Sequence, residues 1–496
     1  MYIAKEAPLT RYQNCSLYTR CGSRGSYSLP DNIPRTGLSL NFILKEENLT
    51  SVIGWILQPN GRGTLDILQS CLITIVLCSW SVLFLNVPSE HDGLWDSLQI
   101  KARWMLFSII FPEVLIGIAI EQWKSACQSI EDFVRLKGQW EVARSSSQSL
   151  EERSRASLNL QRWKSAPWTM RQGFFADMGG IILKFPDETP FPVDSQQLVY
   201  LVEHHHLEYP AIQSCVIWDR NKADIFARAL TLVQILGFFI QSVGRWKQHL
   251  ALSTFELSSL AFIFCCVNTS YFFWHKPRDV STALVLPCPA KIADIMKQVS
   301  LRSCKKYIRT PMDFVTPPTC RTSLVAPSSF RVQACFNWKK MHDGTPVKTF
   351  GNSTISPPRG LNILNIIYVN TVTIAYFGIH LAGWNFVFPS RVEQVLWRVS
   401  CLVLLGMLIF YLCAIALGTV MASWLARTFF KNNEATTILG AASLLPRWAA
   451  ILLHLPVIII YCLARSYIIV EGFVNLRALP VTAFASVNWA NYIPHL

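Results

Sequence analysis

The sequence predicts an all-α membrane protein: a polytopic helical bundle with six or seven transmembrane helices and two long, basic, partly disordered loops. Hydrophobic residues make up 51% of the 496, and charged residues only 15%, whereas soluble domains usually carry about 25% charged residues. The formal net charge is +14, and two long loops hold most of the basic residues. Seven apolar stretches each have about the length of a bilayer crossing: 65–85, 104–120, 225–243, 251–274, 361–384, 399–425 and 448–470.

These stretches are predicted to be helices. A hydrocarbon core of roughly 30 Å needs about 20 apolar residues in helical conformation. Only helices or closed barrels satisfy their backbone hydrogen bonds there, and the stretches show no strand-like alternation. The basic charge is then best explained by loops that contact anionic lipid headgroups. We expect the lipid bilayer as the partner, and no nucleic acid.

The first two segments contain one firm helix and one doubtful one. Residues 1–64 form a polar N-terminal segment without a signal peptide, so we expect the first membrane helix to act as a signal anchor. Segment 65–120 holds that helix, which should end at Asn86-Val87-Pro88, and a short second stretch with Pro112 and Glu113 at its centre. Proline removes a backbone hydrogen bond and a carboxylate is costly in lipid, so this stretch is either a kinked span or a re-entrant segment.

The remaining segments alternate loops with membrane helices. Residues 121–224 form a long loop with amphipathic helices and a small folded element, and 225–274 form a helical hairpin. Residues 275–360 hold 14 Lys and Arg against four Asp and no Glu, which predicts a basic, Pro- and Ser-rich loop that is disordered or peripheral. Residues 361–470 form a three-helix core, and 471–496 a C-terminal tail.

Charge asymmetry predicts the orientation. The loops after stretches two, four and six carry 12, 14 and 3 Lys plus Arg, against 2, 2 and 1 after stretches three, five and seven. This places the long loops in the cytosol and the C-terminus in the lumen or outside. The N-terminus is cytosolic if stretch two spans the membrane and lumenal if it is re-entrant. Glycosylation of the sequons at Asn14 and Asn48 would distinguish the two.

Polar residues inside the apolar stretches are the candidate site. A stripe on one face of the fifth stretch points into the bundle and consists of Asn362, Asn365, Thr373, Tyr376 and His380. It either supplies hydrogen bonds between helices or lines a pocket for a lipophilic ligand. Glu113, Glu256 and Arg465 are the deepest ionisable residues, and we expect Arg465 to approach one carboxylate. Either Glu is alternatively an acid of raised pKa, able to protonate an olefin or epoxide.

The chain lacks complete catalytic signatures. It contains no GxSxG, no HExxH and no dinucleotide fingerprint. The metal-capable side chains of residues 203–208 (EHHHLE) are adjacent rather than four residues apart, and no CxxC pair accompanies the loop cysteines. We therefore predict no metal site and no cofactor.

Several motifs together resemble a functionally uncharacterised family of fungal multi-pass integral membrane proteins. They are GRGT at 61–64, ADMGG at 176–180, WHKP at 274–277, FP at 388–389 with LWR at 396–398, and Glu471 followed by LRALP at 476–480. The resemblance covers residues 55–496. It implies a fungal integral membrane protein, sometimes linked to secondary-metabolite genes, and it supplies no catalytic residues.

Two functions follow as hypotheses. The first is an accessory protein of the endoplasmic reticulum or another endomembrane, acting as a scaffold or transporter. The second is a membrane-embedded enzyme, such as an acid-catalysed cyclase or isomerase, acting on an isoprenoid-type metabolite. In that case Glu113 or Glu256 would donate the proton, and Tyr376 and His380 would line the pocket.

Overall fold

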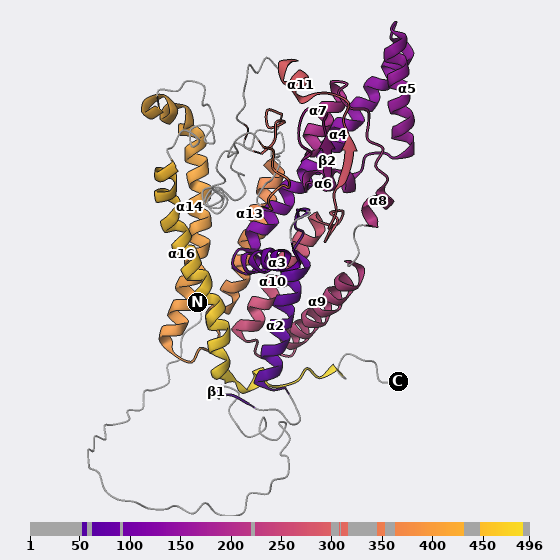
Figure 1. The fold of residues 1–496 in the computed structure, drawn as a ribbon. Coiled ribbons are helices and arrows are strands. Elements are labelled where there is room, and N and C mark those ends of the chain that lie inside the picture. Colours follow the sequence, from indigo (N-terminus) through magenta and orange to yellow (C-terminus); the bar gives the residue numbers. More distant parts are fainter. Residues whose placement is uncertain are drawn as a thin grey trace, which may run out of the picture.

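The computed structural model shows a helical bundle with a smaller domain at one end (Figure 1). It describes residues 52–56, 62–89, 93–219, 224–298, 307, 309–315, 345–352, 363–430 and 447–489. The predicted sites Asn14, Asn48 and Asn362 lie outside these described residues.

Six long helices form the bundle: α2 (Thr64–Ser81), α9 (Asp224–Lys247), α10 (Thr254–Phe272), α13 (Ile363–Leu381), α14 (Arg391–Phe430) and α16 (Arg447–Val474). Five helices in the described part of the chain are long and apolar enough to cross a membrane: Thr64–Ser81, Thr254–Phe272, Leu364–Asn385, Arg391–Cys413 and Leu455–Arg477. They coincide with apolar stretches of the sequence. Six of the seven stretches thus lie in the long bundle helices.

Helix α9 is the one bundle helix named above that is not among the five candidate membrane spans. Its apolar sequence is interrupted by the polar residues Gln234, Gln241 and Arg245. It packs on α2 and turns a broad apolar face outward, formed by the exposed side chains of Leu230, Leu232, Val233, Leu236, Phe239, Ile240, Val243 and Trp246. An apolar face of this extent is unusual on a water-facing helix.

The remaining stretch, 104–120, is broken. Helices α3 (Leu94–Ile110) and α4 (Pro112–Ser146) meet at an angle of 111°. Phe111, between them, leaves the helical region (φ −126°, ψ 55°). Pro112 takes the first position of α4, where its missing N–H costs nothing. The predicted kink is therefore a sharp break within the bundle.

The two ends of the described chain meet at the end of the bundle opposite the domain. Strand β1 (Val52–Ile53) pairs antiparallel with β5 (Leu479–Pro480). The first lies before α2 and the second follows α16 and the short 3₁₀ helix η2 (Asn475–Arg477). A further turn, η3 (Val481–Ala483), follows β5. The 3₁₀ turn η1 (Ala382–Asn385) ends α13 before α14 begins.

The outer part of α4 continues into the domain. There it packs against α5 (Leu150–Ser165), α6 (Met170–Asp177) and α7 (Ser195–Glu203). Helices α8 (Ser214–Trp218) and α11 (Ile292–Gln298) complete the helical part. A three-stranded sheet has the order β3-β2-β4, formed by Phe191–Pro192, Ile181–Lys184 and Leu284–Pro287.

An aromatic group holds the domain core together. The ring of Tyr209 packs against Phe133, Trp140 and Trp163, and its hydroxyl donates to the carbonyl of Ala166 at 2.8 Å. Phe133 and Trp140 both lie on α4. The same helix therefore contributes to the bundle at one end and to the domain core at the other.

The domain corrects two expectations. The all-α fold class is wrong here, because β2 pairs antiparallel with β3 and parallel with β4. The basic loop 275–360 also supplies β4 and α11, and its Val347 N–H donates to the carbonyl of Arg309 at 2.8 Å. Its described parts are therefore folded. Strands of two to four residues give too short a pattern to be recognised in sequence.

The glycines of the ADMGG motif make a tight turn between α6 and β2. Gly179 has a positive φ of 79°. A Cβ on Gly180 would lie 2.5 Å from the Phe175 ring. We expect Gly180→Ala to lower the free energy of unfolding by about 1–3 kcal/mol, as overpacking does. Thermal unfolding in detergent measures this. Gly138→Ala in α4 is the control, because a Cβ at that position meets nothing within 4 Å. An equal loss of unfolding free energy in Gly138→Ala and Gly180→Ala would contradict the prediction.

Candidate functional site

The described residues bury two separate groups of polar and charged side chains within the bundle. The first, which we call the central cluster, consists of Glu113 on α4, Tyr376 and His380 on α13, and Tyr461 and Arg465 on α16. The second, which we call the triad, consists of Arg62, Arg245 and Glu256. Seven of these eight side chains are less than a tenth exposed. The eighth, Tyr461, is half-buried and forms a hydrogen bond with Glu113.

The central cluster surrounds the break between α3 and α4. The Tyr461 hydroxyl lies 2.6 Å from Glu113 Oε1 and 3.1 Å from the carbonyl oxygen of Ile110. Arg465 Nη2 donates to the carbonyl of Ile109 at 3.4 Å. These two side chains therefore bind carbonyl groups that the broken helix leaves without intrahelical partners.

The charges of the cluster also match the two helix ends at the break. The Arg465 guanidinium lies at the C-terminus of α3, where the helix dipole favours a cation. Glu113 occupies the first turn of α4, where the dipole favours an anion. The guanidinium further packs over the rings of Phe262 and Tyr376, each 5.2 Å away. The arrangement stabilises a helix break inside an apolar bundle.

His380 connects α13 to this arrangement. Its Nδ1 lies 3.0 Å from the carbonyl oxygen of Tyr376, and its Nε2 lies 3.2 Å from Arg465 Nη1. A carbonyl only accepts and a guanidinium only donates. These partners assign a neutral imidazole with its proton on Nδ1. His380 thus serves as an acceptor for Arg465.

The structure brings together four of the predicted site residues and separates the others. Glu113, Tyr376, His380 and Arg465 meet in the central cluster. Thr373 instead donates to Val369 of its own helix at 2.8 Å, and Asn365 is half-buried near the start of α13. Tyr461 was missed, although its position four residues before Arg465 puts both on one helix face.

The triad holds the other predicted carboxylate. Arg62 Nη2 forms an ion pair with Glu256 Oε1, and Arg245 Nε lies 3.9 Å from the same oxygen. Glu256 Oε2 accepts from the backbone N–H of Ser253 at 2.9 Å, which closes a capping box at the start of α10. The expectation that Arg465 pairs with a carboxylate is therefore wrong for Glu256. For Glu113, Arg465 lies near it without a direct ion pair among the described contacts.

Both arginines of the triad also bind the chain that follows α16. Arg245 donates to the carbonyls of Thr482, Ala483 and Ala485 at 3.1, 2.9 and 2.8 Å. Arg62 donates to Ala483 at 3.2 Å. The triad thus joins the start of α2, the α9–α10 turn and the C-terminal segment. The sequence signal for these partners was weak, because both arginines lie in polar flanks of apolar helices.

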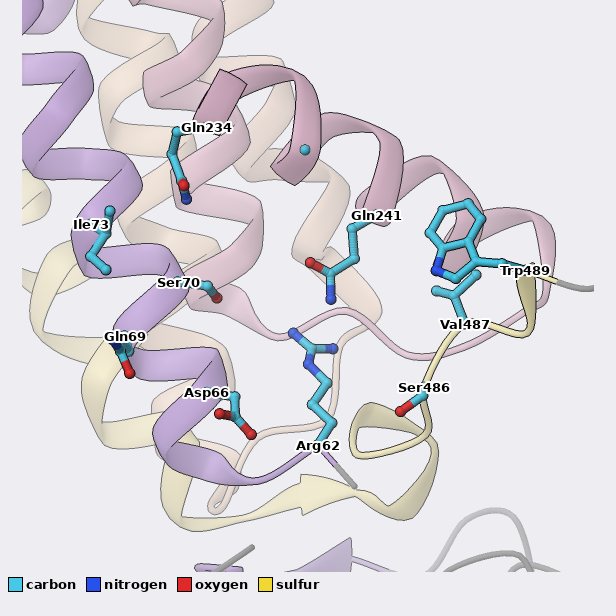
Figure 2. Close-up of a pocket in the computed structure, with 11 residues that line it drawn as sticks. Arg62, Asp66, Gln69, Ser70, Ile73, Gln234, Gln241, Ser486, Val487 and Trp489 are labelled. Carbon is cyan, nitrogen blue, oxygen red and sulfur yellow. The ribbon is translucent and has the colours of Figure 1, made fainter. Parts of the chain in front are cut away.

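The cavities differ strongly in size. The one beside the α3–α4 break has a volume of about 10 Å³ and is lined mainly by Cys78, Pro112, Leu115, Phe262 and Cys265. That is about the volume needed by one water molecule. A much larger pocket of about 740 Å³ lies next to the triad, between α2, α9 and residues 486–489 (Figure 2).

Lys276 lies where the bundle meets the domain. Its Nζ donates to the carbonyl of Phe84 at 2.8 Å and to Oε1 of Gln122 at 2.7 Å. Burial lowers the pKa of Lys276 from 10.5 to about 7, and the nearby Asp177 carboxylate opposes this shift. Burial raises the pKa of Asp177 to about 6. Lys276 therefore connects the chain after α2, α4 and the chain after α10.

This burial predicts a pH dependence of stability. Between pH 7 and 10.5 the unfolded chain holds a proton on Lys276 that the folded chain has lost. Lys276 should therefore make the free energy of unfolding rise with pH in this window, by at most about 1.4 kcal/mol per pH unit. We expect Lys276→Met to remove that part of the slope. Unfolding midpoints at pH 7, 8 and 9 measure it. Lys297→Met, which changes an exposed lysine, should keep the wild-type slope, and identical slopes in all three proteins would refute the prediction.

No metal centre is evident in the described part of the chain, where no three or more His, Cys, Asp or Glu side chains are grouped to hold an ion.

Comparisons with known proteins identify the family. No curated protein and no solved structure matches the chain. One family model matches residues 39–329 and 363–496, which is most of the sequence and includes both buried clusters. The resemblance to an uncharacterised family is thereby confirmed. The chain belongs to the family of unknown function DUF8562.

Proposed function

We propose that this protein is an integral membrane scaffold, in which six helices cross the bilayer and hold a folded domain against its cytosolic face. The observation that carries the proposal is helix α4. Its 35 residues, Pro112–Ser146, run without interruption and place Glu113 inside the bundle and Trp140 in the domain core. The bundle therefore holds the domain in a fixed position rather than through a loose linker.

The surface of the bundle supports its location in lipid. Besides α9, the outward faces of α14 and α16 carry exposed apolar side chains, among them Phe410, Leu417, Leu452 and Leu463. Without a membrane these faces would expose a large apolar area to water. Exposed tryptophans lie near the end of the bundle opposite the domain, at Trp55, Trp246 and Trp489. Tryptophan is enriched at membrane interfaces.

The pairing of β1 with β5 supports a specific topology. It places the chain before α2 and the chain after α16 at the same end of the bundle. An even number of crossings is required for this arrangement. The six bundle helices meet that requirement if the bent α3–α4 pair enters and leaves on the domain side. With the basic loops in the cytosol, both chain ends then face the lumen or the exterior.

The enzyme hypothesis receives less support. Glu113 Oε1 accepts a hydrogen bond from the Tyr461 hydroxyl, and the cavity at the neighbouring helix break has a volume of about 10 Å³. Pockets for small molecules usually measure about 300–1,000 Å³. Glu256 is paired with Arg62, which favours its ionised form rather than a proton donor. An isoprenoid therefore has no room next to Glu113, and Glu256, although close to the larger pocket, is held by Arg62 as an ion pair.

The location is tested with isolated microsomes carrying the full chain with a C-terminal epitope tag. We expect the protein to stay in the pellet after alkaline carbonate treatment. Added protease should cleave the domain and leave the tag protected, and Asn14 or Asn48 should carry glycans. Extraction by carbonate, or cleavage of the tag in intact microsomes, would overturn the proposal.

The role is tested by disrupting the gene and profiling metabolites and membrane complexes. A scaffold predicts that Glu113→Gln, expressed at wild-type level, restores whatever the disruption removes. The same should hold for Tyr461→Phe, which keeps the aromatic ring. An enzyme predicts instead that one linear precursor accumulates and that Glu113→Gln fails to clear it. Immunoblots of the membrane fraction control for loss of the variant protein.

A further inference from the structure

The pocket next to the triad has no role in the proposed scaffold. Its walls come from α2, α9 and the chain after η3, with Arg62 at its base (Figure 2). Its lining residues are Arg62, Asp66, Gln69, Ser70, Ile73, Gln234, Gly237, Gln241, Ser486, Val487 and Trp489. A volume of about 740 Å³ lies within the range of ligand sites, about 300–1,000 Å³.

The polar side chains of the pocket have spare hydrogen-bonding capacity. Gln69, Gln241 and Ser486 make no side-chain hydrogen bond to any described residue. Gln234 uses its amide nitrogen to reach Thr74 Oγ1 at 3.0 Å, which leaves its carbonyl oxygen for another donor. Amides offer both donors and acceptors. Such a set suits hydroxyl groups, which also donate and accept.

The charges around the pocket favour a neutral ligand. Arg62 is already paired with Glu256, and Asp66, in the first turn of α2, accepts from the backbone N–H of Gly63 at 2.8 Å. Arg62 and Arg245 contribute two positive charges, and Glu256 and Asp66 two negative ones. A phosphate or carboxylate ligand would be repelled by the Asp66 carboxylate, and no unpaired cation of the pocket would offset this repulsion. A sugar or other polyol carries no such penalty.

The position of the pocket indicates where the ligand comes from. Ile73 and Gly237 line it, and from there the exposed apolar side chains of Val76, Leu236 and Ile240 continue along α2 and α9. Trp489, whose side chain is partly exposed, closes the other side. Aromatic rings at this depth lie at the membrane–water boundary. An acyl chain can follow the helices while its headgroup fills the pocket.

We propose that the pocket between α2 and α9 binds the neutral, hydroxylated headgroup of a glycolipid. The inference rests on the proposed membrane location of these helices. The amide side chains would bind the sugar hydroxyls, and Trp489 would cover the apolar face of the ring. A free sugar shares this chemistry, so the experiment separates the two sources.

Gly237 offers a way to fill the pocket without disturbing the fold. A Cβ at this position meets nothing within 4 Å, so the side chain of Gly237→Leu would enter the open space. A Cβ on Gly378 of α13 or on Gly406 of α14 likewise meets nothing within 4 Å. Gly378→Leu and Gly406→Leu therefore serve as matched controls that add the same side chain elsewhere.

The test uses native mass spectrometry of the full chain in an amine-oxide detergent, which lacks sugar. Glucosylceramide and ceramide, which differ only in the glucose, are added in equal amounts. We expect wild type to retain glucosylceramide over ceramide by about tenfold, the ratio that one or two additional hydrogen bonds provide. Gly237→Leu should bring the ratio near one, and both control variants should keep it.

The outcomes are distinct. Equal retention of the two lipids by wild type, or an unchanged ratio in Gly237→Leu, would overturn the inference. Displacement of glucosylceramide by an equal concentration of methyl glucoside would show that a soluble sugar is the ligand, and would overturn the lipid source. Carbonate extraction reports independently on the membrane location. A protein that stays in the pellet but retains no glucosylceramide leaves the proposed function intact and this inference wrong.

Discussion

Replacing Glu256 with glutamine is expected to lower the free energy of unfolding by about 3–5 kcal/mol, the usual loss when one partner of a buried ion pair is removed. The substitution keeps the shape of the side chain but removes its charge. Arg62 and Arg245 would then be buried together without an anion, and both are less than a tenth exposed. Chemical denaturation in detergent micelles measures the loss.

A second ion pair at the same end of the bundle provides the control. Glu393 pairs with Arg477, but Arg477 is 58% exposed, and exposed pairs contribute at most about 1 kcal/mol. Glu393→Gln should therefore cost far less than Glu256→Gln. Similar losses in the two variants would show that the triad does not hold the C-terminal segment against α2 and α10.

Replacing Arg465 with methionine is the second large effect, expected at about 3 kcal/mol or more because it leaves buried polar groups without a partner. Methionine has a similar length but no hydrogen-bond donor. The carbonyl of Ile109 and Nε2 of His380 would lose their donor. Glu113 would also lose the nearest cation of the central cluster. Denaturation in micelles again measures the loss.

A double-mutant cycle separates this electrostatic role from packing. Arg465→Met combined with Glu113→Gln should cost less than the sum of the single losses, by about 0.5–3 kcal/mol, as for residues within one network. The reason is that the neutral glutamine no longer needs the cation. Strictly additive losses would mean that Arg465 and Glu113 do not sense each other across the break.

The sequence predicted the bundle helices well and their partners poorly. Apolar runs of about 20 residues are a long and redundant signal, and Pro112 marked the break between α3 and α4. Periodicity also placed Tyr376 and His380 on one face of α13. It could not show that this face meets Arg465 rather than lipid or a ligand, because that depends on how α16 packs against α13.

The sheet and the triad could not be predicted from the sequence, for a different reason. Strand β2 lies about a hundred residues before its parallel neighbour β4, and each has four residues. Neither run differs locally from a loop. Arg62 and Arg245 looked like ordinary basic flanks of apolar helices, as the positive-inside pattern leads one to expect. Only the folded chain brings both to Glu256.

The uninterrupted helix α4 fixes the angular phase between the bundle and the domain. Each residue of an α-helix turns the chain by about 100° and advances it by 1.5 Å. Inserting a single alanine into the middle of α4 would therefore rotate the entire domain by about 100° about this axis. The contacts that join the domain to the bundle beside α4, of Phe174 with Phe273 and of the Val87 N–H with the carbonyl of Met178, could not survive such a rotation. The number of residues in α4 therefore sets both the orientation of the domain and its distance from the bundle.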